Sequence, residues 1–286
     1  MAEQLILSNN QIKATFSTKG AELISVEKDG KEKIWIGDPN VWGCHAPILF
    51  PICGGLKDDK YIYDGKEYTL KKHGYARNEE FEVESQTDNS IVFLHKFNEE
   101  TLKQFPFEYE LRVIYTLNGS EIKVDYVVKN LADTDMYYSV GAHEGYYCPE
   151  GIEEYSVIFD KPEMLDSSIL DGNLLEYNTI NVGENTCELP LKYEYFAVDA
   201  LVFLNLKSDK LTLKNRTTGE EIGLEFEGHD FFLLWTKPGA NYICLEPWCG
   251  GPDFVDSDYD FKNKKGIIKL SGKEEATRTH KITFYN

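Results

Sequence analysis

YELRVIYTLNGSEIKVDYV, residues 109–127, is the stretch that determines the predicted fold class. Polar and apolar residues alternate on both sides of Asn118-Gly119, as they do in half-buried β-strands. An Asn-Gly pair between two alternating runs is a strong indication of a two-residue hairpin turn. We therefore predict an antiparallel hairpin here.

Similar runs recur along the chain, and turn-forming residues separate them. Further strands are predicted at residues 11–16, 81–83, 91–94, 157–159, 211–213 and 267–270, with turns at Asp29-Gly30, Asp64-Gly65, Thr218-Gly219 and Ser271-Gly272. Helical periodicity is confined to Glu99–Phe105, and Pro106 ends that predicted helix. No repeat, low-complexity tract or linker interrupts the pattern. We predict a single all-β domain over residues 1–286, a mostly antiparallel sandwich with very little helix.

Composition limits the class of ligand. With 42% apolar and 13% aromatic residues, the 286-residue chain can bury a sizeable core. A formal net charge of −19 argues against a nucleic-acid partner, because phosphate backbones require a basic surface. Only four arginines are present, so a phosphate clamp built from several arginines would use most of them. A neutral small-molecule ligand fits this composition better.

Location is predicted from features that the sequence lacks. The amino-terminal residues show no basic start followed by an apolar core and a cleavage site. No apolar run approaches the roughly 20 residues that cross a bilayer. The six cysteines are scattered and are expected to remain thiols. We expect a cytoplasmic protein with no membrane partner.

Glu246 is the first candidate for chemistry. It follows the predicted buried strand Tyr242–Leu245, and we expect Pro247 to halt strand pairing directly after it. That position would hold a carboxylate on a rigid element facing a cleft, beside Gly250-Gly251, where a backbone could approach a ligand. Judged by residue type alone, a solvated glutamate at a strand end is the commoner situation.

Histidines supply the second set of candidates. His143 ends an apolar stretch before Gly145, and imidazole is suited to proton transfer near neutral pH. His73 precedes Arg77 by four residues, and either histidine could instead be a hydrogen-bonded core residue. Asp199 interrupts an apolar segment and must be paired if it is buried. Structural roles are expected for His45, His95 and His229, and a solvated position for His280.

Other kinds of site are poorly supported. The spacings of Cys244 with Cys249 and of His143 with Cys148 do not match structural zinc sites, so no metal is predicted. No Gly-x-Ser-x-Gly nucleophile motif or phosphate-binding glycine loop occurs. The four tryptophans could stack on a sugar ring, although most are expected in the core.

Five segments together resemble one known family. They are Ala46–Pro51 (APILFP), His73–Arg77 (HGYAR), Gly141–His143 (GAH), Trp235–Gly239 (WTKPG) and Glu246–Trp248 (EPW). In this order they resemble the aldose 1-epimerase (galactose mutarotase-like) family, and in particular its LacX-like branch. The resemblance extends over essentially the whole chain.

The resemblance implies a fold and a set of roles. The implied fold is the β-supersandwich of galactose mutarotases, and the implied reaction is the interconversion of α and β anomers of a hexose. Glu246 matches the base that takes the proton of the C1 hydroxyl, and His143 matches the acid that protonates the ring oxygen. His73 and Asp199 match substrate-binding residues, and no cofactor is implied.

One position departs from the family pattern. Where an arginine often helps to bind the sugar, this chain has Gly55. Lys57 or Arg77 could substitute for it, and we include Arg77 among the expected substrate-binding residues. The reaction is therefore better supported than the identity of the sugar.

Several alternatives remain open at this point. One is a mutarotase for a hexose phosphate, with a phosphate held by Arg77 and Lys57. Another is a sugar-binding protein without catalytic activity, and a third is a glycoside hydrolase with Glu246 and Asp199 as its carboxylate pair. The sequence leaves a monomer and a homodimer equally open.

Overall fold

The predicted hairpin is the centre of the largest sheet. In the computed structural model, which describes residues 2–285, β9 (Tyr109–Asn118) pairs with β10 (Glu121–Asn130), and Asn118 lies opposite Glu121. Alternate residues of β9 are buried, as the sequence pattern predicts. The mostly antiparallel all-β prediction is confirmed, since all pairings between the named strands of residues 2–285 are antiparallel.

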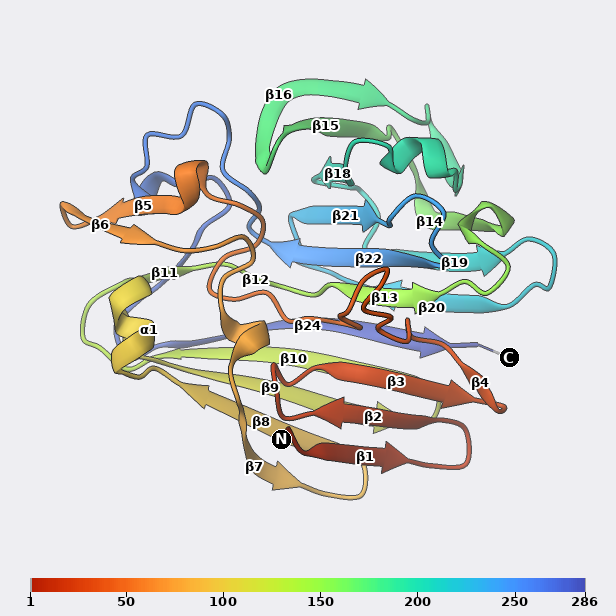
Figure 1. The fold of residues 1–286 in the computed structure, drawn as a ribbon, viewed down its shortest axis with the longest axis horizontal. Helices are drawn as coiled ribbons and strands as arrows, with labels where there is room; N and C mark the ends of the chain where they lie inside the picture. Colours follow the sequence, from red (N-terminus) through yellow and green to blue (C-terminus); the bar gives the residue numbers. More distant parts are fainter. Residues whose placement is uncertain (1, 286) are drawn as a thin grey trace.

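Nine strands form this sheet in the order β17-β14-β19-β20-β24-β10-β9-β8-β7. The other strands of the sheet are β7 (Glu82–Gln86), β8 (Ser90–Lys96), β14 (Tyr155–Glu163), β17 (Thr186–Pro190), β19 (Lys210–Asn215), β20 (Glu221–Glu225) and β24 (Glu275–Phe284). A four-stranded sheet covers one end of the nine-stranded sheet (Figure 1). In this smaller sheet, the ring centroid of Phe16 lies 4.5 Å from that of Tyr115 on β9. The smaller sheet contains β1 (Gln4–Ser8), β2 (Lys13–Ser17), β3 (Leu23–Lys28) and β4 (Lys31–Glu32).

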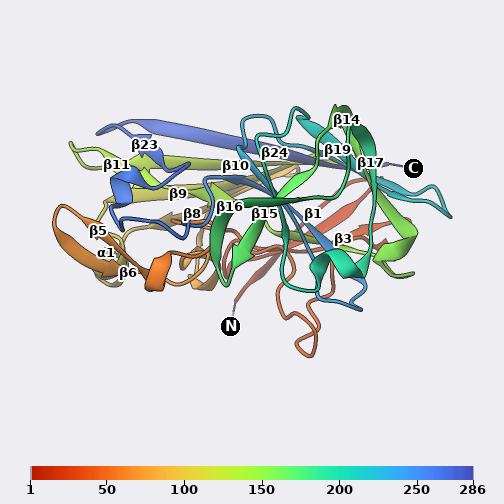
Figure 2. The same cartoon turned by 90° about the horizontal axis from the view of Figure 1, so that it is seen from above.

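A seven-stranded sheet lies against the nine-stranded one (Figure 1; Figure 2 shows the layers from above). Its strands are β12 (Val140–Gly141), β13 (Glu144–Tyr147), β15 (Asp166–Asp171), β16 (Leu174–Asn181), β18 (Leu201–Leu204), β21 (Phe231–Trp235) and β22 (Tyr242–Cys249). Every residue of β22 is buried. Ile243 and Leu245 join the main apolar core between the sheets, whereas Cys244, Glu246 and Trp248 point to the opposite side, called here the pocket face.

Smaller elements surround these sheets. Two-stranded pairs are formed by β5 (Lys60–Tyr63) with β6 (Lys66–Thr69) and by β11 (Met136–Tyr138) with β23 (Ile268–Leu270). The predicted helix is confirmed as α1 (Glu99–Gln104), which Asn98 caps by accepting from two backbone N–H groups. Single 3₁₀ turns occur at Lys57–Asp59, Ala76–Asn78, Ile152–Glu154, Tyr193–Phe196 and Phe261–Asn263. Within residues 2–285, no helix has the length and apolar character needed to cross a bilayer.

Pro247 does not end its strand, so the prediction of a strand-end Glu246 is wrong. β22 continues through Pro247 to Cys249 and keeps its pairing with β21 on one side. On the other side the missing N–H of Pro247 interrupts the ladder between β12 and β13. Ala142 still donates to the Pro247 carbonyl at 3.1 Å, and its own carbonyl accepts the indole N–H of Trp248 at 2.9 Å instead. A side chain therefore replaces the backbone donor that proline lacks.

His280 also differs from its prediction. It lies on β24 with 1% of its surface exposed, and its Nε2 is 2.9 Å from Glu144 Oε1 on β13. This hydrogen bond joins the nine-stranded sheet to the seven-stranded sheet. The expectation of a solvated histidine failed because proximity to the chain terminus does not imply exposure when the last strand is central in its sheet.

Candidate active site

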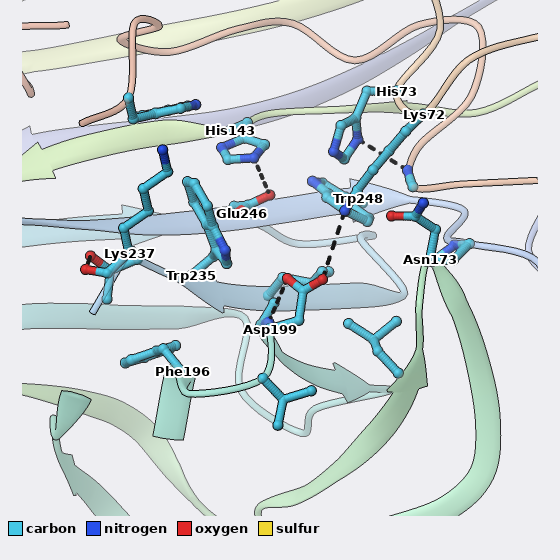
Figure 3. Close-up of a pocket in the computed structure, with 18 of the residues that line it drawn as sticks. Lys72, His73, His143, Asn173, Phe196, Asp199, Trp235, Lys237, Glu246 and Trp248 are labelled. Carbon is cyan, nitrogen blue, oxygen red and sulfur yellow. Dashed lines mark hydrogen bonds and ion pairs between the residues drawn. The ribbon is translucent and has the colours of Figure 1, made fainter. Parts of the chain in front are cut away.

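A cavity of about 490 Å³ opens on the pocket face of the seven-stranded sheet. All five residues predicted from the sequence line it, and they come from four separate parts of the chain. Figure 3 labels four of them, His73, His143, Asp199 and Glu246. Glu246 is on β22, His143 lies between β12 and β13, His73 and Arg77 belong to the segment after β6, and Asp199 is in the loop before β18. The fold therefore assembles the predicted residues around one space.

Glu246 and His143 face each other across two strands. The register that places Gly141 opposite Trp248 and Glu144 opposite Leu245 also places His143 opposite Glu246. Directly opposed residues of an antiparallel pair project from the same face. His143 Nε2 lies 3.4 Å from Glu246 Oε2, and the Glu246 residue is only 1% exposed. Strand register thus fixes the distance between the two groups.

Burial favours the neutral forms of this pair. It raises the pKa of Glu246 well above the usual carboxyl value, and the opposing effect of Lys72 is smaller. It also lowers the pKa of His143 to about 3. The neutral pair, a carboxylic acid beside an uncharged imidazole, has no net charge. A carboxylate with an imidazolium would have the same total charge and requires only a proton shift across the gap.

His73 is held in one tautomer by a backbone group. The Gly54 N–H donates to His73 Nδ1 at 3.1 Å, so in the neutral ring the proton is on Nε2. Burial and the nearby His143 lower the pKa of His73 well below its usual value. The His73 and His143 rings lie 5.5 Å apart, edge to face. His73 can therefore donate a hydrogen bond from Nε2 without carrying a charge.

Aromatic side chains enclose the catalytic candidates. Trp42, Trp235 and Trp248 all line the cavity. Trp42 stacks on His143, with their ring centroids 5.2 Å apart. Gly145 permits this approach, because a Cβ at that position would lie only 2.8 Å from the Trp42 ring. The walls offer flat apolar surface to a sugar ring.

Asp199 and its neighbours supply charge at the rim. Asp199 Oδ2 is 3.9 Å from Lys72 Nζ, and its Oδ1 accepts the Ala200 N–H at 2.8 Å. Arg77 lines the cavity, and its Nη2 donates to the Lys72 carbonyl at 3.1 Å. The pairing that the sequence demanded for a buried Asp199 is present, although a quarter of its side chain is exposed.

Lys57 does not reach the cavity. Its Nζ contacts the Ser257 carbonyl at 3.3 Å and lies 5.2 Å from the Tyr259 ring centroid, away from the cavity lining. Of the two suggested replacements for an arginine at position 55, Arg77 alone is in place.

Within residues 2–285 one group of side chains has the arrangement to hold a metal ion. Ligand atoms of His143, Cys244 and Glu246 lie within 4.8 Å of one another. The sequence spacings considered above did not indicate this set, which arises because residues 244 and 246 share one face of β22. Burial raises the pKa of Cys244 well above its usual value, which disfavours the thiolate that binds metals.

Lys72, Lys237 and Asn173 also line the cavity, and no role was assigned to them from the sequence. Lys72 stands directly before His73, so that motif contained a signal for it. Lys237 falls within the WTKPG segment, and its Nζ donates to the Val41 carbonyl. Asn173 lies in the β15–β16 turn, where nothing in the sequence distinguishes it from an ordinary turn residue.

Comparisons with known proteins agree on one family. A family model described as aldose 1-epimerase matches residues 3–280. Protein LacX of Lactococcus lactis subsp. lactis is 35% identical over 295 residues, covering 98% of this chain and 99% of LacX. A galactose mutarotase related enzyme of Lactobacillus acidophilus superposes with a TM-score of 0.94 at 34% identity, covering 99% of this chain and 98% of that one. A galactose mutarotase-like protein of Lactobacillus casei ATCC 334 also gives 0.94, at 28% identity, covering 99% and 100%.

Proposed function

The chain belongs to the aldose 1-epimerase family, and from this premise we propose that it interconverts the α and β anomers of an unphosphorylated aldose such as glucose or galactose. The observation that carries the proposal is the His143–Glu246 pair, 3.4 Å apart on the floor of a cavity of about 490 Å³. A cavity of this size accommodates a monosaccharide.

The two groups have complementary parts in the proposed reaction. The Glu246 carboxylate takes the proton of the C1 hydroxyl, while the His143 imidazolium gives a proton to the ring oxygen. The bond between C1 and the ring oxygen breaks, C1 becomes an aldehyde, and rotation about C1–C2 exposes its other face. Closure returns both protons. Each positioned group contributes roughly 10²- to 10⁴-fold to the rate.

The remaining predicted residues would orient the sugar. His73 can donate from Nε2 to a sugar oxygen, because Gly54 fixes its tautomer. Asp199 can accept from a sugar hydroxyl at the rim, and Arg77 can donate to one. The aromatic walls would pack against the apolar faces of the ring.

A second candidate is a mutarotase for a hexose phosphate. The observation that favours it is the presence of Lys72, Arg77 and Lys237 in the cavity lining. Against it, Lys72 is already close to Asp199, and Arg77 is bonded to a backbone carbonyl. A phosphate would have to compete with these partners, so the neutral sugar remains the leading proposal.

The test is a mutarotation assay on freshly dissolved α-anomers, followed by polarimetry. The panel contains glucose, galactose and glucose 6-phosphate, with the spontaneous rate subtracted. We expect catalytic acceleration for at least one neutral hexose. A clear preference for the phosphate would replace the leading proposal by the second, and no acceleration of any aldose would contradict both.

A further inference from the structure

Gly54-Gly55 connects two walls of the candidate active site. Gly54 bonds to His73, and Gly55 packs against the β15–β16 turn. A Cβ added to Gly55 would lie 2.6 Å from the Cβ of Asn173 and 3.1 Å from its carbonyl oxygen, too close for a side chain. The absence of a side chain at position 55 is therefore what allows Asn173 to occupy that place.

Backbone hydrogen bonds fix this turn to the rest of the site. Leu175, two residues after Asn173, donates to the Asp253 carbonyl at 2.8 Å and accepts from the Val255 N–H at 3.0 Å. Asp253 in turn donates to the Gly55 carbonyl at 2.9 Å. The turn, the segment after β22 and Gly55 thus form one hydrogen-bonded wall. These hydrogen bonds fix the backbone of the turn from which the Asn173 side chain projects.

The Asn173 side chain is available to a ligand. It lines the cavity and extends toward the part that contains Lys72 and Trp248 (Figure 3). Among residues 2–285 its amide group has no hydrogen-bond partner. A carboxamide can donate and accept at the same time, as a sugar hydroxyl can. The cations nearby are already engaged, Lys72 with Asp199 at 3.9 Å and Arg77 with a carbonyl at 3.1 Å.

We propose that Asn173 determines sugar specificity by hydrogen bonding to one ring hydroxyl of the aldose. This inference rests on the proposed mutarotase function and adds a residue outside the sequence motifs of the site. The chemistry that it selects is a hydroxyl at one ring position and in one orientation. Asn173 touches the substrate away from C1, so it affects binding more than the chemical step.

The test measures kcat and KM for Asn173→Ala with glucose, galactose and their monodeoxy derivatives. We expect KM for the preferred sugar to rise about 3- to 10-fold, because the variant loses one hydrogen bond to the sugar. Its kcat should stay within about twofold of the wild-type value. One deoxy sugar should give the same KM with the wild type and the variant, and its missing hydroxyl is the one that Asn173 binds. Asn178→Ala is the matched control, because Asn178 is exposed on the same hairpin, bonded to Glu176 and outside the cavity lining.

The outcomes are separable. An unchanged KM for Asn173→Ala on every sugar that the wild type anomerises overturns this inference alone. So does an equal rise in KM for Asn178→Ala, which would indicate a general disturbance of the hairpin. A wild-type protein that accelerates no aldose overturns the proposed function, and the inference with it.

Discussion

Two glutamate–histidine pairs lie on opposite faces of the seven-stranded sheet. His143 and Glu144 are consecutive, so their side chains point in opposite directions. His143 meets Glu246 at 3.4 Å in the cavity, and Glu144 meets His280 at 2.9 Å between the sheets. All four residues are at least nine-tenths buried. Residue type and burial are therefore the same for a candidate catalytic pair and for a structural one.

The difference between the pairs is access. Glu246 and His143 line a cavity of about 490 Å³, whereas Glu144 and His280 do not line it. The first pair pays for its position in desolvation, which shifts both pKa values toward neutral forms. The second pair connects two layers of the core. We infer that the His143–Glu246 pair takes part in the reaction and that the Glu144–His280 pair stabilises the fold.

The largest expected effect separates the pairs by activity. Glu246→Gln keeps the shape of the side chain but removes the base, so kcat should fall about 10³-fold with little change in sugar affinity. Polarimetry gives the rate, and calorimetric titration with the sugar gives the affinity. Glu144→Gln is the matched control and should keep kcat within about threefold. Equal losses of kcat in the two variants would contradict the assignment of a catalytic role to one pair and a structural role to the other.

The next effect separates them by stability. His280→Ala leaves Glu144 buried without its partner and should lower the free energy of unfolding by about 3 kcal/mol. Urea denaturation followed by circular dichroism measures the change, and kcat of the folded variant should stay near the wild-type value. Lys281→Ala, on the same strand with its side chain partly exposed, should change stability by less than about 0.5 kcal/mol. A stable His280→Ala protein would show that the second pair is dispensable.

Asp199 sharpens the comparison inside the cavity. Its carboxylate is 25% exposed and paired with Lys72, so we expect a role in binding rather than in proton transfer. Asp199→Asn should raise KM about tenfold with kcat changed by less than threefold, as expected for one hydrogen bond to a charged group. Initial rates over a range of sugar concentrations give both constants. A loss confined to kcat would instead place Asp199 in the chemical step.

The smallest effect concerns pH and stability. Because the pKa of Glu246 is raised in the folded state, folding favours its protonated form. Wild-type stability from this group is therefore full below the ordinary carboxyl pKa of about 4.3 and is lost as pH rises toward the folded value. Glu246→Gln cannot ionise, so the free energy of unfolding of this variant, relative to that of the wild type, should rise between pH 5 and pH 8. Urea denaturation at both pH values measures the gain, and a constant difference would contradict the raised pKa.

Local sequence patterns predicted the elements better than their contacts. The β9–β10 hairpin and the alternation of β9 are properties of neighbouring residues, and both are confirmed, although the two turn residues are Gly119-Ser120 because Asn118 still pairs with Glu121. The pairing of His143 with Glu246 depends on the register of strands about a hundred residues apart, which only the family resemblance suggested. Pro247 misled because its missing N–H falls on the side where Trp248 supplies a donor.

Residues whose positions depend on packing between distant segments could not be predicted from the sequence. Asn173 enters the site because Gly55 has no side chain, a contact between distant segments. His280 was misjudged because its position near the end of the chain said nothing about a central strand. The motifs contain the residues for which we propose chemical roles, since those roles demand particular side chains. They did not predict the residues that complete the walls.

The aromatic enclosure has a practical consequence. Three of the four tryptophans line one cavity, so most of the intrinsic fluorescence of the protein originates around the site itself. The indole of Trp248 is hydrogen-bonded to the Ala142 carbonyl, directly beside His143, and its emission should respond when a sugar displaces water there. The molecule thus contains its own optical reporter, and ligand titrations can be followed without a label.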